Sequence, residues 1–127
     1  MDSIQQAAIR KKSFELNYNG GTIWCEHLDG MGGYEDEVVA KFLGDKKAFS
    51  RPSSSAFMII DLDKTDITNR ITETIFSAFE NNGKVFRKIA FVGVGSRFRR
   101  KIKALKANGV AVETFDDYEK AKEWLLP

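Results

Sequence analysis

The feature that most constrains the fold is a repeated change from a short apolar run to a helical pattern. Two runs, AFMIIDL at 56–62 and RKIAFVGVG at 87–95, are nearly continuous in apolar residues, which is typical of strands buried on both faces. Each run is followed by apolar residues at helical spacing, over 69–83 and 96–109. Strands that alternate with helices pair in parallel through right-handed crossovers. The sequence therefore predicts an α/β fold with a parallel core.

An antiparallel hairpin is predicted ahead of this core. Residues 13–19 alternate apolar and polar side chains, NGG at 19–21 favours a tight turn, and 22–28 form the return strand. A helix is expected over 34–49, a short strand over 110–115 and a last helix over 116–126. The predicted fold is a mixed sheet with an N-terminal β-hairpin, then alternating β-α units with helices packed on the sheet.

Length and composition favour one cytoplasmic domain. The chain has 127 residues, which fits a lead-in over 1–12 and a single domain over 13–127. No run approaches the 18 or so apolar residues of a transmembrane helix, so no transmembrane segment is expected. Cys25 is the sole cysteine and forms no internal disulfide, which makes the cytoplasm the expected location.

The charge is unevenly distributed along the chain. Between positions 84 and 106 there are nine Lys or Arg and no Asp or Glu, whereas 113–123 hold five acids against two lysines. Such a basic segment attracts anions, or it is a solvated helix face offset by the acidic last helix. Because no aromatic stacking platform accompanies the basic residues, nucleic acid is not the expected partner.

The turn that follows the second buried run contains two glycines, Gly93 and Gly95. A dinucleotide fingerprint needs a third glycine three residues after the second, where this chain has Phe98. A Walker loop needs Gly-Lys-Ser/Thr, which is absent from the sequence. No cofactor is therefore expected. Either Ser96 simply caps a helix after a tight turn, or the free N–H groups there hold one anion together with Arg97, Arg99 and Arg100.

Two carboxylates follow the first buried run, in the stretch DLDKTD. Asp61 and Asp63 are two residues apart, so they share one side of an extended chain. Such a pair suits Mg²⁺, or a nucleophile with an acid/base beside it. The stretch resembles the first motif of haloacid-dehalogenase-type phosphatases, which implies Asp61 as nucleophile and Asp63 as acid/base. The alternative is that both are solvated loop residues next to the following helix.

A third candidate lies in the stretch WCEH of the return strand. Cys25 and His27 are expected on one face, where they are either a nucleophilic dyad or a buried structural thiol beside a polar imidazole. The dyad lacks an orienting third group. Two ligands are also too few for zinc, so no metal site is expected.

Taken as a whole, roughly residues 13 to 126 resemble the STAS, or anti-sigma-factor-antagonist-like (SpoIIAA-like), family. The stretches that carry this resemblance are AFMIIDLDKTDIT, RITETIFSAFE, RKIAFVGVGSRFRRKIKAL and VAVETFDDYEKAKEWL. The most similar branch also resembles lipid-binding CRAL-TRIO domains. Members that act as phospho-switches carry Asp-Ser-Ser/Thr-Gly at the entry of the helix after the third strand. Here that place reads Asp66-Ile67-Thr68-Asn69-Arg70, which leaves Thr68 as a phosphorylation candidate or a plain helix cap.

The resemblance implies a small non-enzymatic regulatory domain that docks a partner protein or a small anionic or lipid-like ligand. A homodimer stays open. The expected contact surface combines the entry of the 68–79 helix with the neighbouring turn, because both lie at the carboxyl edge of a parallel sheet. It consists of Asp66, Thr68, Asn69, Arg70, Gly93, Gly95, Ser96 and Arg97. The alternative function is a Mg²⁺-dependent phosphatase that uses Asp61 and Asp63.

Overall fold

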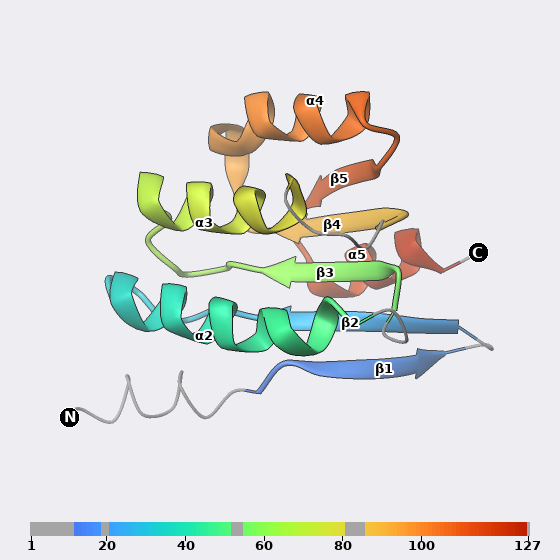
Figure 1. Cartoon of the computed structure of the whole chain (residues 1–127), viewed down its shortest axis with the longest axis horizontal. Helices are drawn as coiled ribbons and strands as arrows, with labels where there is room; N and C mark the ends of the chain where they lie inside the picture. The colour runs from blue at the N-terminus through green and yellow to red at the C-terminus, as the bar shows by residue number, and fades with distance from the viewer. Residues whose placement is uncertain (1–11, 19–20, 52–54, 81–85, 127) are drawn as a thin grey trace.

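The computed structural model describes residues 12–18, 21–51, 55–80 and 86–126, with only the backbone of Tyr18 and Arg97. Within these ranges five strands form one sheet in the order β1-β2-β3-β4-β5 (Figure 1). β1 (Phe14–Tyr18) and β2 (Gly21–His27) are antiparallel. β3 (Phe57–Asp61), β4 (Lys88–Val92) and β5 (Ala111–Phe115) continue in parallel from β2. The predicted mixed sheet with its N-terminal hairpin is confirmed.

Some predicted segments fall outside the described residues. These are positions 1–11 of the predicted lead-in and positions 19–20 of the predicted hairpin turn. The register across the hairpin is nevertheless defined on both sides of that turn, because Phe14 pairs with Cys25 and Tyr18 with Gly21.

The helices are divided unequally between the two faces of the sheet. α2 (Glu35–Phe49), α3 (Asn69–Glu80) and α4 (Arg99–Ala107) cover one face, and α5 (Tyr118–Leu125) covers the other (Figure 1). A 3-10 turn, η1 (Gly95–Phe98), leads into α4. The common face of α2, α3 and α4 follows from the strand order: each crossover moves the chain one strand in the same direction, so right-handed connections place these helices on one side.

The larger core lies under α2, α3 and α4. The rings of Phe76, Phe91 and Phe98 contact one another there, with centroids 5.0–5.4 Å apart. Phe98, Ile102 and Leu105 recur at helical spacing in the sequence, which predicts an inward stripe over 96–109, and all three residues are buried. In α2, Leu43 has apolar helical spacing but is 46% exposed.

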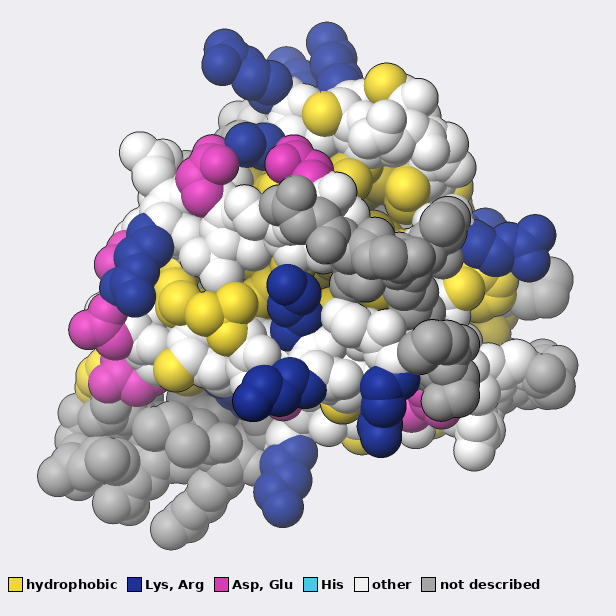
Figure 2. All heavy atoms as spheres, in the orientation of Figure 1, with side chains coloured by type: hydrophobic (Ala, Val, Ile, Leu, Met, Phe, Trp, Pro, Cys, Tyr) yellow, Lys and Arg dark blue, Asp and Glu magenta, His cyan; other side chains and the backbone are white. Residues whose placement is uncertain are grey.

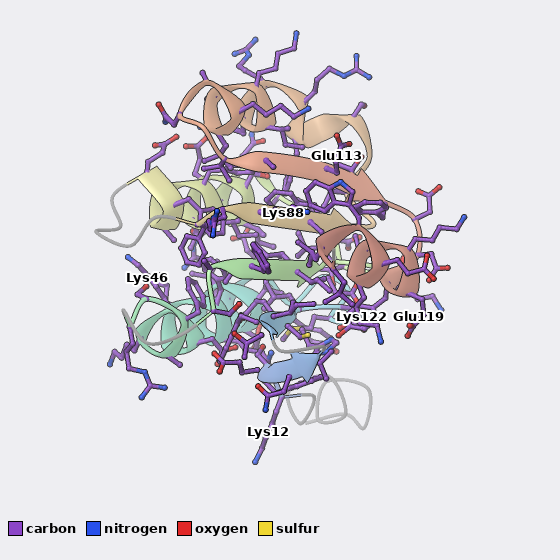
Figure 3. All side chains as sticks on the ribbon, turned by 90° about the vertical axis from the view of Figure 1, so that its right-hand side faces the viewer. Lys12, Lys46, Lys88, Glu113, Glu119 and Lys122 are labelled. Atoms are coloured by element: carbon purple, nitrogen blue, oxygen red, sulfur yellow. The ribbon has the colours of Figure 1, made fainter. Side chains whose placement is uncertain are left out.

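The smaller core lies between the sheet and α5. Its buried members are Ile23, Cys25, Ile59, Ala90, Val92, Ala121 and Leu125. Asp117 caps α5, because its side chain accepts a hydrogen bond of 2.9 Å from the Glu119 amide. Figure 3 views the molecule from the side on which α5 is visible and labels Lys88 on the sheet. The Lys88 ammonium lies 5.2 Å from the ring centroid of Trp124 and ties the end of the helix to the sheet.

Beyond their ends, β2 and β3 stay joined through the loops that follow them. The amide of Leu28 donates to the Asp61 carbonyl at 3.0 Å, and the amide of Gly30 donates to the Asp63 carbonyl at 2.7 Å. The Thr65 hydroxyl donates to the Leu28 carbonyl at 2.6 Å. This extended ladder fixes both loops at the carboxyl edge of the sheet.

One carboxyl group lies inside the protein beneath α2. Glu26 is fully buried, and its Oε1 accepts a hydrogen bond of 2.8 Å from the indole N–H of Trp24. Burial, together with the neighbouring carboxyl group of Asp45, raises the pKa of Glu26 to about 9. Glu26 is therefore protonated in the folded protein at neutral pH.

Among the helices in the described part of the chain, none combines the length and the apolar character that a membrane crossing requires.

Candidate functional site

A basic hollow of about 560 Å³ lies between the N-terminal parts of α3 and α4. It is lined by four cationic side chains, two polar side chains of α3, one acid and the serine of η1: Arg99, Arg100, Lys101, Lys103, Asn69, Thr72, Glu73 and Ser96. Figure 2 shows Lys and Arg side chains projecting from the end of this face where Figure 1 places α4. The hollow brings together Asn69 and Ser96, which the sequence assigned to one contact surface.

A second hollow of about 320 Å³ adjoins the first, between α4 and β5. The two hollows share Ser96, Arg99 and Lys103. Lys101 is held by an ion pair with Glu73 of α3, with Nζ 3.0 Å from Oε1. Arg99 and Lys103 are therefore the cations best placed to meet a ligand that enters from either side of α4.

The acidic last helix does not offset this basic surface. α4 packs in the larger core and α5 in the smaller one, on opposite faces of the sheet. Figure 3 shows Glu119 and Lys122 beside each other on α5, where their charged atoms are 3.0 Å apart. Of the two interpretations of the basic segment, the one that relies on the acidic last helix therefore has no support from this arrangement.

The other residues predicted at the entry of α3 have structural contacts. The Thr68 hydroxyl accepts a hydrogen bond of 3.2 Å from the Ile71 amide, which is the role of a helix cap. The guanidinium of Arg70 is turned toward α2, where it pairs with Glu35 at 3.3 Å and with Asp36. Asp66 is exposed, and its amide donates to the Gly32 carbonyl at 2.9 Å.

The predicted turn residues also divide in their roles. Gly93 has φ +77°, and a Cβ there would lie 2.8 Å from Cα of Asp63. Gly95 has φ +62° and open space around it. Ser96 lies inside η1 and its side chain caps neither η1 nor α4, so the predicted serine cap is wrong. Its exposed hydroxyl lines both hollows instead. The side chain of Arg97 lies outside the described part of the chain.

On the opposite face, the carboxyl edge holds a second cluster of polar side chains. His27 ends β2 and Asp61 ends β3, and the two residues are partners in the parallel register. Asp29 follows in the loop, with Oδ1 3.3 Å from Nδ1 of His27. One ligand atom from each of His27, Asp29 and Asp61 lies within 4.8 Å of the others.

Asp63 is not a member of this cluster. The chain turns after β3, so Asp61 is 6% exposed while the Asp63 side chain is open to solvent. The Asp63 amide donates to Oδ1 of Asp61 at 3.1 Å. The expectation that Asp61 and Asp63 share one side of an extended chain is wrong, because the strand ends at Asp61.

Cys25 lies deeper on the same face. The thiol is fully buried, and desolvation raises its pKa although a hydrogen bond with Tyr118 acts in the opposite direction. A thiol kept neutral and away from solvent is a poor nucleophile. The structure thus favours the structural interpretation of Cys25 over a dyad with His27.

Comparisons with known proteins supply no family for this chain. No protein-family model, no curated protein and no solved structure matches it. The function is therefore inferred from the side chains and their geometry.

Proposed function

We propose that the chain is a small non-enzymatic binding domain of STAS-like type, whose basic hollow between α3 and α4 holds an anionic group. The observation that carries this proposal is the lining of the hollow: Arg99, Arg100 and Lys103 of α4 line it together with Ser96. Guanidinium, ammonium and hydroxyl groups are the donors that bind phosphate and carboxylate oxygens. The anionic group belongs to a small ligand, a lipid headgroup or an acidic segment of a regulatory partner.

The size of the hollow and its surroundings support a ligand rather than a purely solvated face. About 560 Å³ falls in the range of roughly 300–1,000 Å³ that small-molecule sites occupy. Among the described residues of its lining, the one acid, Glu73, is already paired with Lys101. The remaining cations are close together in the chain, so their positive potentials add over the same surface.

The test is a titration of the full chain with inorganic pyrophosphate, followed by amide chemical shifts in NMR and by calorimetry. We expect the largest shifts at Asn69, Ser96 and the first turn of α4. The double variant Arg99→Ala/Lys103→Ala should lower the affinity about tenfold, because two charge-assisted contacts are lost. Added salt should weaken binding in the parent protein. Vesicles that contain phosphatidylserine, and a poly-glutamate peptide, then separate a lipid headgroup and an acidic partner from a free anion.

The matched control removes the same charge elsewhere. Lys47 of α2 and Lys120 of α5 are exposed and lie outside both hollows. The variant Lys47→Ala/Lys120→Ala should bind pyrophosphate as the parent protein does. If both double variants lose affinity equally, net charge and not the hollow attracts the anion, and the proposal fails.

The phosphatase alternative has weaker support in the geometry. It needs two carboxylates at one reaction centre, whereas Asp61 is buried toward α5 and Asp63 is exposed in the turn. Hydrolysis of a generic phosphate ester with Mg²⁺, abolished in Asp61→Asn, would nevertheless overturn the non-enzymatic proposal.

A further inference from the structure

The cluster of His27, Asp29 and Asp61 is held in place from several directions. The backbone amide of His27 donates a hydrogen bond of 3.0 Å to the Ser13 hydroxyl. The imidazole lies between two aromatic rings, with centroids 5.5 Å from Phe14 and 5.4 Å from Tyr118. The orientation of the imidazole is thus set before any ligand arrives.

The two carboxylates are equally well positioned. Asp61 belongs to a strand that is paired on both sides, and its Oδ1 is fixed by the Asp63 amide at 3.1 Å. Asp29 lies in the loop that the extended β2–β3 ladder holds, between the hydrogen-bonded residues Leu28 and Gly30. The side chains of His27 and Asp29 are 11% and 13% exposed, so the cluster is largely shielded but can be reached from solvent.

The donor set defines the chemistry of a ligand. One imidazole nitrogen and two carboxylate oxygens are ligands for divalent metals, and imidazole favours first-row transition metals over Mg²⁺ and Ca²⁺. Metal bonds of about 2.0–2.2 Å require ligand atoms roughly 3–4 Å apart. The three atoms already lie within 4.8 Å of one another, so small side-chain movements suffice to close them around an ion.

We propose that His27, Asp29 and Asp61 form a binding site for a divalent first-row transition metal, with Zn²⁺ bound more tightly than Mn²⁺. Three protein ligands leave at least one coordination position for water or for a group of a second ligand. The site lies on the α5 face, so it is separate from the basic hollow on the α3 and α4 face. The proposal is independent of the anion-binding function.

The experiment uses the full chain after treatment with a chelator and removal of that chelator. Calorimetry with Zn²⁺, Mn²⁺, Mg²⁺ and Ca²⁺ measures affinity and stoichiometry, and NMR locates the bound Zn²⁺ through the amides of His27, Asp29 and Asp61. We expect one Zn²⁺ per chain, weaker binding of Mn²⁺, and the weakest binding of Mg²⁺ and Ca²⁺. Asp61→Asn keeps the side-chain shape and should lower the Zn²⁺ affinity at least about tenfold.

Two further variants make the result decisive. Asp63→Asn removes a neighbouring acid outside the cluster and should bind Zn²⁺ as the parent protein does. Asp29→Asn changes a loop residue and should weaken binding like Asp61→Asn, which keeps the test valid if the strand variant fails to fold. Equal Zn²⁺ affinity in the parent, Asp29→Asn and Asp63→Asn proteins would overturn the proposal. Binding of Mg²⁺ or Ca²⁺ as tight as that of Zn²⁺ would overturn the assignment to transition metals.

Discussion

At the scale of single residues, the turn after β4 shows a glycine that the backbone itself requires. Gly93 adopts φ +77°. A Cβ atom at this position would lie only 2.8 Å from Cα of Asp63, so the two backbones leave no room for a side chain here. The contact joins the turn after β4 to the turn after β3. The role of Gly93 is therefore to let two turns pack against each other at the carboxyl edge of the sheet. The hollow itself is lined by other residues, such as Ser96.

Replacing Gly93 with alanine should destabilise the protein by more than the conformational penalty alone. Gly109 has φ +89° with open space around it, so Gly109→Ala isolates that penalty of about 1–2 kcal/mol. Gly93→Ala adds a backbone clash and should cost at least about 1 kcal/mol more in the free energy of unfolding. Urea denaturation of both variants measures the difference. Equal losses of unfolding free energy in the two variants would show that the turns move apart to accommodate the Cβ at no energetic cost, which would contradict this prediction.

The sequence alone predicts properties of a surface that depend on residue type, such as its charge. It does not predict which side chains meet when that depends on how two strands align. The basic character of the surface near Ser96 could be predicted from the run of lysines and arginines alone. The partnership of His27 with Asp61 could not, because it depends on how β2 and β3 align. Asp29 was missed for the same reason, since a lone loop acid carries no signal until its neighbours in space are known.

At the scale of elements, the helices that the structure describes are divided unequally, with α2, α3 and α4 on one face of the sheet and α5 on the other. α5 alone shields the residues of the smaller core in the described chain. Within α5, Ala121 and Leu125 are fully buried, one helical turn apart. Because α5 is short, it contacts the sheet through few buried side chains. Truncating one of them should remove a large part of the packing between α5 and the sheet.

Leu125→Ala should therefore destabilise the protein by about 2–5 kcal/mol, the usual cost of truncating a buried leucine to alanine. The matched control is Leu43→Ala in α2, because Leu43 is 46% exposed and should change stability by no more than about 0.5 kcal/mol. Thermal and urea unfolding of the two variants provide the comparison. A loss of stability at Leu43 as large as that at Leu125 would contradict the expectation that the cost of each truncation follows the burial of the side chain.

Elements were the level at which sequence patterns predicted most. The stripe of Phe98, Ile102 and Leu105 was predictable because helical spacing is local, and an acidic cap on the last helix was predictable as Asp116 or Asp117, of which the structure shows Asp117. Local patterns did not reveal that Leu43 is exposed, because the exposure of a side chain depends on its neighbours in space and not on its spacing along the helix. They also did not reveal the 3-10 turn ahead of α4, which places Ser96 beside the hollow instead of at a cap.

At the scale of the whole molecule, stability depends on a proton held in the core. The Glu26 carboxyl faces Asp45 and Lys41 of α2 as well as the indole of Trp24, and burial keeps it protonated. The Lys41 ammonium donates a hydrogen bond of 3.0 Å to the Ser13 hydroxyl, and its Nζ lies 3.5 Å from Oδ2 of Asp45. The unfolded chain exposes Glu26 to water, where it ionises near its ordinary pKa of 4.5.

Folding therefore takes up a proton between these two pKa values, and the free energy of unfolding should fall as the pH rises from about 5 to about 9. The stabilisation is complete below the unfolded pKa and is lost as the pH rises toward the folded one. The contribution of this group has a slope of at most about 1.4 kcal/mol per pH unit. Denaturant unfolding at a series of pH values measures it.

Glu26→Gln cannot ionise and should flatten this part of the pH dependence. Glu80→Gln, at the exposed end of α3, should keep the slope of the parent protein. A Glu26→Gln protein with an unchanged slope, or a parent protein whose stability rises with pH through this window, would contradict the buried proton.

The order of the strands in space is the order of the strands in the chain, and this has a consequence for synthesis. Each strand pairs with the one translated just before it, and none has to insert between two strands that are already joined. A nascent chain can thus extend the sheet at one growing edge, strand after strand, with each loop closure spanning a single helix. Assembly then proceeds in the direction of translation, and α5 docks on the second face of a sheet that already exists.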